Sequence, residues 1–366
     1  VWTDQSGIIE ASSLGIEDAG TNAFVRFRVP QDKIKNGNAV IAVKNASGTV
    51  MWSWHLWFIH DDALNTTACW NYQNKRYDFT EEALGMKYTA WIGTSYSSPR
   101  SIKVKVRQTK GQISPATRTE AILTITQNPG NVRQGFTTLY QEGRKDAFPG
   151  TDAGLVGTFN QNAGDNISIQ NSIQHPENFY TSGLSWESFL PGSYSWYNLW
   201  SANNTTTGWN DNPVVKTVYD PCPVGFKMPA SNAFTGFSKT GSYTMTQADL
   251  NVFGAWNNGW EFNNKINAPD ATVYFYASNS RDESAGFLGI GGNGSYWAAT
   301  PYINVDGICL LFEQGSIAPK QTVYRACGMS VRPVAEPKTR VTPKLPGSTE
   351  EDWSNNEDLD AGDIDI

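Results

Sequence analysis

The sequence predicts a mainly β protein, with a β-sandwich-like N-terminal region followed by an α+β C-terminal domain that carries long loops. Two observations lead to this fold class. Aromatic residues make up 13% of the 366 residues and glycine occurs 33 times, a composition typical of short strands and many turns. Apolar and polar residues alternate clearly up to about Asn131, whereas the stretch that follows is rich in Gly, Asn, Ser and Thr and only weakly periodic.

The clearest predicted element is a β-hairpin from Asn38 to Phe58, with NAVIAVKN as one arm and VMWSWHLWF as the other. Residues 45–48, Asn-Ala-Ser-Gly, supply the turn. In the second arm one face is wholly apolar and consists of Val50, Trp52, Trp54, Leu56 and Phe58. Because strand residues alternate between two faces, we expect this face to lie on the core, so these tryptophans contribute to the fold and do not form an exposed binding surface.

Apolar–polar alternation and composition divide the chain into three predicted regions. Residues 1–131 form the β-sandwich-like region, which begins inside strand-like sequence and is therefore expected to be N-terminally incomplete; 132–334 form the second domain; 335–366 form an acidic tail expected to be disordered. In SIKVKVRQT, Ile102, Val104 and Val106 are expected to face the core of the first region. The second domain is expected to contain short helices at Trp186–Phe189, Ala230–Phe237 and Gln247–Ala255, and strands at Thr272–Tyr276, Ser295–Thr300, Gly307–Phe312 and Val323–Val331.

The charge of −7 is concentrated at one end of the chain. Eight acids and no bases lie between Glu350 and Asp365, so the rest of the chain carries a net charge of +1. A nearly neutral body offers no basic field for nucleic acid. No apolar run reaches the roughly 18 residues that a transmembrane helix needs, so we expect no transmembrane segment.

Four cysteines, Cys69, Cys222, Cys309 and Cys327, occur without a CxxC pair. Their even number permits one or two disulfides in an oxidising compartment, and buried thiols are the alternative. If the last two strands form a hairpin centred near Ala318, Cys309 faces Cys327. We therefore expect a cross-strand disulfide or a close contact between these two residues, while Cys69 and Cys222 have no assigned partner.

The sequence lacks the usual catalytic patterns, since HExxH, GxSxG and the P-loop do not occur. Glu142 and Asp146 in YQEGRKD are the one carboxylate pair that could serve an enzyme acting on polysaccharide. The alternating charges of this stretch favour a local ion-pair turn at the junction of the two regions. We therefore expect no enzymatic activity and name no catalytic residue.

Aromatic residues beside amides in the loops are the best indication of a binding site. Sugars stack their C–H faces on Trp and Tyr, while Asn and Asp bind the hydroxyls. The candidate ligand-binding residues are Trp196, Tyr197, Trp200, Trp209, Asn210, Asp211, Trp256 and Trp260. The competing interpretation is that these rings replace a regular core beneath long loops.

The sequence does not decide whether the protein binds calcium. WNDNP at residues 209–213 is similar to one element of C-type lectins, and the tail offers Asp358, Asp360, Asp363 and Asp365. Neither stretch provides a full coordinating set, and the alternative for WNDNP is an Asx turn before a proline. The metal ligands are therefore unknown and no cofactor is expected.

Three motifs resemble a known family. DPCPVGFKMP (residues 220–229), GSYWAATP (294–301) and YRACGMSVRPV (324–334) resemble the major paralogous domain first described in Fibrobacter, with Lys227 in place of Arg and Ala298-Ala299 in place of two serines. Upstream, LYQEGRKDAFPG and RSIKVKVRQT resemble segments of Bacteroidales surface proteins, some of them fimbrial. The resemblance implies a C-type-lectin-like fold and an exported protein, outer-membrane-associated or fimbrial and often a lipoprotein.

These observations together predict a non-enzymatic cell-surface binding protein, a fimbria-associated or pilus-tip adhesin that recognises a glycan or a host or matrix surface protein. Two alternatives remain. The chain could be a structural pilus subunit joined to other pilus subunits by strand exchange. It could also be a polysaccharide-acting enzyme.

Overall fold

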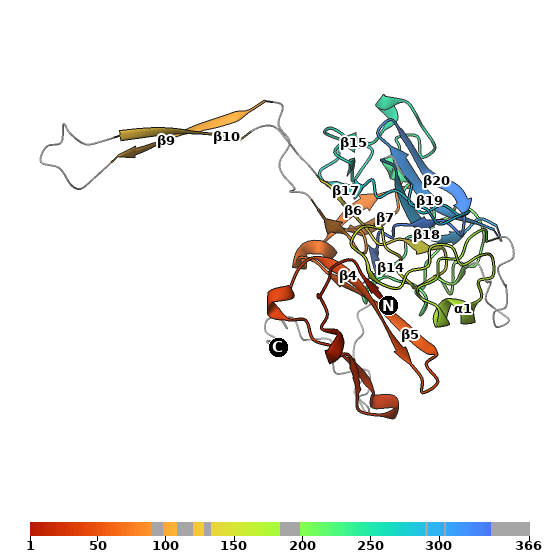
Figure 1. The fold of residues 1–366 in the computed structure, drawn as a ribbon. Helices are drawn as coiled ribbons and strands as arrows, with labels where there is room; N and C mark the ends of the chain where they lie inside the picture. Colours follow the sequence, from red (N-terminus) through yellow and green to blue (C-terminus); the bar gives the residue numbers. More distant parts are fainter. Residues whose placement is uncertain are drawn as a thin grey trace, which may run out of the picture. The chain divides into compact units, whose positions relative to one another are not determined.

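The computed structural model describes residues 1–89, 98–107, 120–127, 133–183, 198–289, 292–303 and 305–337 (Figure 1). Strands dominate these residues, which confirms the mainly β prediction. The α-helix α1 spans Ile169–Gln174 and begins at Ser168, whose side chain accepts a hydrogen bond from the Asn171 amide. Short 3₁₀ turns lie at Ala11–Ser13, Gly20–Asn22, Gln31–Lys33, Asp61–Leu64, Thr235–Phe237 and Gln247–Asp249. In the part of the chain described, no helix is long and apolar enough to cross a membrane.

Two four-stranded sheets combine segments that lie far apart in the sequence. The first has the order β13-β1-β4-β5, with β13 at Val156–Gly157, β1 at Trp2–Thr3, β4 at Gly37–Lys44 and β5 at Val50–Phe58. The second has the order β14-β22-β7-β6, with β14 at Phe226–Lys227, β22 at Val334–Ala335, β7 at Arg76–Thr80 and β6 at Thr66–Trp70. Each sheet therefore contains strands from both sides of residue 131.

The remaining strands form smaller sheets. Two are three-stranded: β15 (Val252–Phe253), β16 (Gly259–Asn263) and β17 (Thr272–Tyr276); and β18 (Gly294–Pro301), β19 (Asp306–Glu313) and β20 (Ser316–Tyr324). The two-stranded pairs are β2 (Gly15–Glu17) with β3 (Phe24–Arg26), β8 (Lys87–Tyr88) with β11 (Gly135–Phe136), β9 (Arg100–Arg107) with β10 (Glu120–Gln127), and β12 (Tyr140–Gln141) with β21 (Gly328–Met329).

Residues Val1–Ala335 form one compact unit. The expected boundary at 131–132 does not fall between the sheets, because both four-stranded sheets cross it. Most of the acidic tail, residues 338–366, lies outside the described residues.

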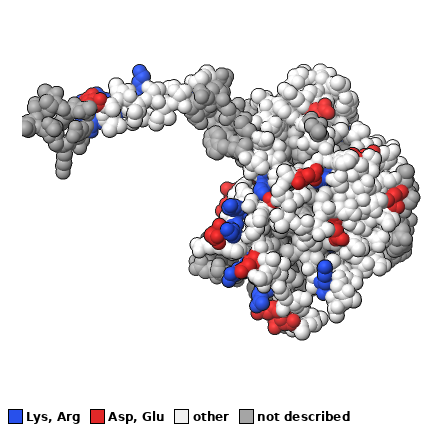
Figure 2. All heavy atoms as spheres, viewed as in Figure 1, with Lys and Arg blue, Asp and Glu red and all other residues white. Residues whose placement is uncertain are grey.

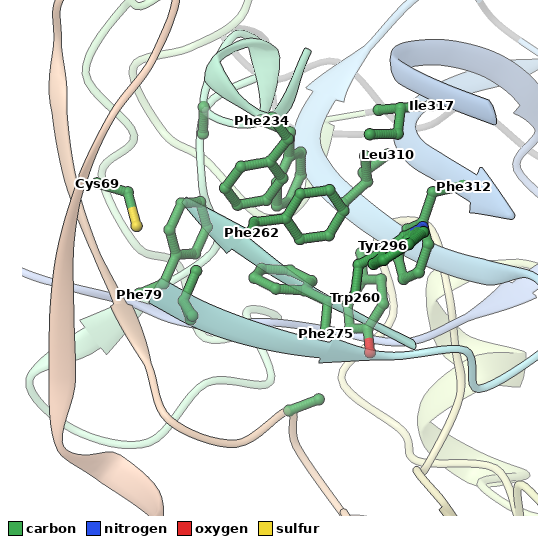
Figure 3. Packing of buried hydrophobic residues seen from close by; sticks show 14 of the residues in the cluster. Cys69, Phe79, Phe234, Trp260, Phe262, Phe275, Tyr296, Leu310, Phe312 and Ile317 are labelled. Carbon is green, nitrogen blue, oxygen red and sulfur yellow. The ribbon is translucent and has the colours of Figure 1, made fainter. Parts of the chain in front are cut away.

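An aromatic cluster fills the core around β16 to β20 (Figure 3). Phe237 stacks on Phe262 with ring centroids 4.2 Å apart, and Phe275 meets Phe237 edge-on at 5.1 Å. Phe79 of β7 stacks on Phe234 at 5.4 Å, so the N-terminal half of the chain contributes to the same core. Such pairs add about 0.5–1.5 kcal/mol each beyond the buried area.

The hairpin predicted at Asn38–Phe58 is confirmed as β4 and β5, but the expected core face of β5 is only partly buried: Val50 is buried, whereas Trp52, Leu56 and Phe58 are partly buried. Trp54, on the face expected in the core, is 39% exposed. On the other face Met51 is exposed, but Ser53 is buried and donates to Asp146, and the partly buried Trp57 donates from its indole N–H to the Met86 carbonyl over 3.0 Å. The hydrogen bond to Asp146 explains the burial of Ser53, because polar groups are buried where they are paired.

The β9–β10 hairpin corrects the prediction that Ile102, Val104 and Val106 face a core. Ile102 is 62% exposed and pairs across the ladder with Ile125, which is exposed as well. The opposite face carries Lys105, which bridges to Glu120 over 2.5 Å. This pair of strands is therefore a separate two-stranded sheet and no part of a sandwich.

The three motifs that carry the family resemblance lie together in space. The Ala299 amide of the second motif donates to the Pro229 carbonyl of the first, over 2.8 Å, and Trp297 donates to Ser330 of the third, over 3.0 Å. Lys227 and Val334 are opposite each other in β14 and β22. The motif residues therefore build the centre of the fold.

The predicted Cys309–Cys327 disulfide is wrong. All four cysteines are buried and none forms a disulfide. The β19–β20 hairpin turns at residues 314–315, which places Gln321 opposite Cys309 and leaves Cys327 beyond the end of β20. The two thiols lie in the same core cluster, and Cys309 contributes to the raised pKa of Cys327.

Candidate functional site

The predicted ligand-binding tryptophans divide by burial. Trp200 and Trp260 are fully or almost fully buried, and each indole N–H donates to a backbone carbonyl, of Arg144 and Glu313 respectively, over 3.1 Å. Figure 3 shows the Trp260 ring inside the aromatic cluster. Trp256 packs edge-on against Trp260 at 5.5 Å. These three rings serve packing, whereas Trp196 and Tyr197 lie outside the described residues.

Trp209 is different, because 44% of it is exposed. Its ring lies against the Tyr302 ring, with centroids 5.1 Å apart and planes tilted by 40°. Lys320 contributes twice: its carbonyl accepts the Trp209 indole N–H over 3.0 Å, and its ammonium lies 5.8 Å from the ring centroid. We call Trp209, Tyr302 and Lys320 the Trp209 platform.

The loop that carries Trp209 is held on both sides of the ring. The Gly208 amide donates to the Pro301 carbonyl over 3.0 Å, and the Asn210 amide donates to Ser231 Oγ over 2.8 Å. The Asn212 amide donates to the Asn210 side-chain oxygen over 2.9 Å, which is the Asx turn that the proline context predicts. The ring is therefore fixed before any ligand arrives, which lowers the entropic cost of binding.

Polar side chains lie on both sides of Trp209 in the same loop. The amide nitrogens of Asn210 and Asn212 lie 3.5 and 3.3 Å from the hydroxyl oxygen of Thr206, and both Asn212 and Thr206 are exposed. An exposed aromatic ring with amides and a hydroxyl in the same loop can stack a sugar ring and bind its hydroxyl groups.

Asp211 belongs to the fold. Its Oδ1 accepts hydrogen bonds from Asn71 over 2.7 Å and from the Tyr77 hydroxyl over 2.6 Å, and its Oδ2 accepts one from Asn232 over 3.1 Å. These contacts tie the WNDNP loop to β6 and β7. Among the described residues no group of three or more His, Cys, Asp or Glu side chains is placed to hold a metal ion, and the tail aspartates are outside that range.

Tyr302 and Lys320 are platform residues that were not among the candidates predicted from the sequence. Tyr302 directly follows GSYWAATP, so an aromatic residue at the end of a predicted strand was the available signal. Lys320 had no such signal, because the last predicted strand began three residues later. Only the observed register of β20 brings its backbone to Trp209.

The YQEGRKD segment forms the buried ion pairs that the sequence suggested. Arg144 and Lys145 both bridge to Asp146, over 3.0 and 2.5 Å. Burial alone would raise the pKa of Asp146, but the two cations more than offset it, so its pKa lies below the ordinary value. Glu142 departs from the predicted local turn, since it pairs with the distant Arg325. Both carboxylates are buried, so neither lines a surface where a polysaccharide could bind.

Acidic and basic side chains are mixed on the face shown in Figure 2, with large uncharged areas between them. That distribution fits a neutral ligand better than a polyanion. Comparisons of the chain with protein-family models, with curated proteins and with solved structures found no match.

Proposed function

We propose that this chain is a non-enzymatic cell-surface binding protein that recognises a glycan through the Trp209 platform. One observation carries the proposal: among the candidate tryptophans that the structure describes, Trp209 alone combines an exposed ring, an aromatic neighbour and amide side chains in the same loop. The rigid loop beneath it supports a preformed site.

The class of protein rests on the resemblance of the three motifs to the major paralogous domain. It supports an exported protein, outer-membrane-associated or fimbrial, with a C-type-lectin-like C-terminal region and a role as a pilus-tip adhesin. The nearly neutral body gives no support to a nucleic-acid partner. Glu142 and Asp146 are buried in ion pairs with Arg325 and Arg144, respectively, and this disfavours a polysaccharide-acting enzyme.

An array of glycans and matrix proteins, probed with the purified chain, tests this function. Each array is run with calcium and again with EDTA. We expect a glycan signal that survives EDTA, because the Asp211 oxygens already accept hydrogen bonds from three protein side chains. A signal lost in EDTA would assign the recognition to a metal-dependent site, and a blank array would contradict the function.

The β9–β10 hairpin favours a second candidate function, that of a structural subunit joined to its neighbours by strand addition. Within the described residues, neither strand pairs with another on its outer edge, and the face with Ile102, Leu123 and Ile125 is exposed. An unpaired edge beside an aliphatic face is a template for an added strand.

Sedimentation velocity over a concentration series tests this second function. We expect concentration-dependent association that Ile102→Lys weakens and that Lys103→Ala, on the opposite face, leaves unchanged. A chain that stays monomeric at every concentration and with every added pilus subunit would contradict it.

A further inference from the structure

A second aromatic surface lies at the turn between β6 and β7. There, an open pocket of about 370 Å³ is lined by Trp70, Asn71, Tyr72, Asn74 and residues 265–267. We call it the Tyr72 pocket. Its volume lies within the roughly 300–1,000 Å³ that is usual for small-molecule sites. None of these residues is among the binding residues predicted from the sequence, although CWNYQN places two aromatic rings among amides.

The turn that carries Tyr72 is rigid. The Asn71 side-chain oxygen accepts the Lys75 amide over 2.8 Å, and the Asn74 amide donates to the Asn71 carbonyl over 2.9 Å. Asn74 has φ +60°, a left-handed conformation that asparagine tolerates. Tyr72 is 52% exposed, and its ring lies so close to Gly241 that a Cβ there would come within 2.4 Å of it. Gly241 therefore packs directly against the Tyr72 ring, where a larger residue would not fit.

The opposite wall is equally fixed. The buried Asn264 donates to the Ala68 carbonyl over 3.1 Å and to Asp270 Oδ1 over 2.8 Å, which anchors the loop of residues 264–271. Lys265 lies 4.7 Å from the Trp70 ring centroid and is paired with Asp270 over 2.7 Å. The Trp70 amide donates to the Asn264 carbonyl over 2.8 Å, so the two walls are joined directly.

The polar groups of the pocket indicate the charge of its ligand. Both cations beside Trp70 have an acidic partner, Lys265 with Asp270 and Arg76 with Asp78, each over 2.7 Å. Their charge is therefore largely offset, and an anionic ligand would gain little. The side-chain amides of Asn74 and Asn267 are exposed, and the structure records no hydrogen bond to either among the described residues. They are available to bind hydroxyl groups.

We infer that the Tyr72 pocket is a second carbohydrate subsite, which takes a neutral sugar ring stacked on the exposed face of Tyr72. The Asn74 and Asn267 amides bind its hydroxyls. The inference rests on the proposed glycan recognition and extends it, because the Asn71–Asp211 hydrogen bond of 2.7 Å ties this pocket to the loop that carries Trp209. The chain then contacts its glycan at two places and prefers uncharged oligosaccharides.

The test is an NMR titration of the ¹⁵N-labelled full chain. The probes are neutral cello-, malto-, laminari- and manno-oligosaccharides, with oligogalacturonate as the anionic comparison. We expect one neutral series to shift the side-chain amide signals of Asn74 and Asn267 and the Trp70 indole signal. Tyr72→Ala weakens that binding about fivefold or more, whereas Trp54→Ala, which removes an exposed ring elsewhere, leaves it unchanged.

Two further variants separate the possible outcomes. Asn74→Gly keeps the turn, since glycine adopts positive φ readily, and is expected to weaken binding even if Tyr72→Ala disturbs folding. With Trp209→Ala the Asn74 and Asn267 shifts are expected to persist.

Shifts caused only by oligogalacturonate would overturn the neutral ligand. The absence of shifts, with array binding that still depends on Trp209, would overturn the second subsite alone. The absence of both signals would overturn the proposed function as well.

Discussion

Arg325 donates from Nε to Glu142 Oε2 over 2.7 Å, and each side chain is only 1% exposed. The pair joins the segment after β12 to the segment after β20 in the interior of the molecule. Glu142 Oε1 has no hydrogen-bond partner, and burial raises the pKa of this carboxyl to about 7 although Arg325 opposes the shift. The folded protein therefore binds a proton here that the unfolded chain releases from about pH 4.5 upward.

The first prediction concerns Glu142→Gln. A carboxyl whose pKa is higher in the folded state contributes stability that is fully present below about pH 4.5 and is lost as pH rises to about 7, whereas Gln does not titrate. The free energy of unfolding of the wild type relative to Glu142→Gln should therefore fall by about 3 kcal/mol over that range. Urea titrations at pH 4.5, 6 and 8 measure this difference.

Glu261→Gln is the matched control, because Glu261 pairs with Arg133 over 2.7 Å where both side chains are partly exposed. Its effect on unfolding should be less than about 1 kcal/mol at every pH. A Glu142→Gln difference that does not change with pH would contradict the raised pKa.

The second prediction concerns His55, whose Nδ1 and Nε2 lie 2.9 Å from the Tyr140 hydroxyl and 3.0 Å from Asn38 Oδ1. The Asn38 amide nitrogen donates to Asp4 over 2.7 Å, so its oxygen must accept from His55 Nε2–H. Burial lowers the pKa of His55 to about 3, so the ring is neutral when folded.

The stability that the neutral His55 ring contributes is lost as pH falls from about 6.5 through 3. ¹⁵N NMR should show a neutral Nε2–H tautomer at pH 5; a protonated ring there would contradict the arrangement.

The third prediction is that the cysteines remain thiols. Burial raises the pKa of Cys69 to about 12 and raises that of Cys309 and Cys327 as well, so reactive thiolate is scarce at neutral pH. Intact mass should be the same before and after reduction. An alkylating reagent should label the native protein slowly and label all four sites once urea unfolds it. A mass gain of two protons on reduction would show a disulfide.

The fourth prediction compares two phenylalanines. Phe275 is fully buried and contacts the rings of Phe79, Phe237 and Phe262, so Phe275→Ala should lower the free energy of unfolding by about 3–5 kcal/mol. Phe253 is 64% exposed, and Phe253→Ala should change it by about 0.5 kcal/mol or less. Equal effects in urea titrations would show that the aromatic cluster is not the stabilising core.

The alternation of apolar and polar residues along the sequence was sufficient to predict individual strands. Alternation located β4 and β5, and the prediction of Thr272–Tyr276 matches β17 residue for residue. It could not decide which face of β5 is buried, because Ser53 is buried through a hydrogen bond to Asp146, 93 residues away. It also placed Ile102 in a core, since a strand pattern is the same whether or not another element covers it.

Only part of the candidate site could be predicted from the sequence. Trp209 and the Asx turn after it could be named, because turn chemistry is local. Trp200 and Trp260 have the same loop-like sequence context, and their burial follows only from the strands that pack around them. The partners of Trp209 and Asp211, namely Tyr302, Lys320 and Asn71, come from distant segments and required the structure.

Binding of a glycan by matched tryptophan variants tests the central claim most directly. Calorimetric titration with the strongest array ligand would compare the wild type, Trp209→Ala and Trp54→Ala, whose removed rings are similarly exposed at 44% and 39%. The account predicts that Trp209→Ala weakens binding about tenfold while Trp54→Ala binds like the wild type. Equal affinity of the wild type and Trp209→Ala would show that the platform is not the glycan site.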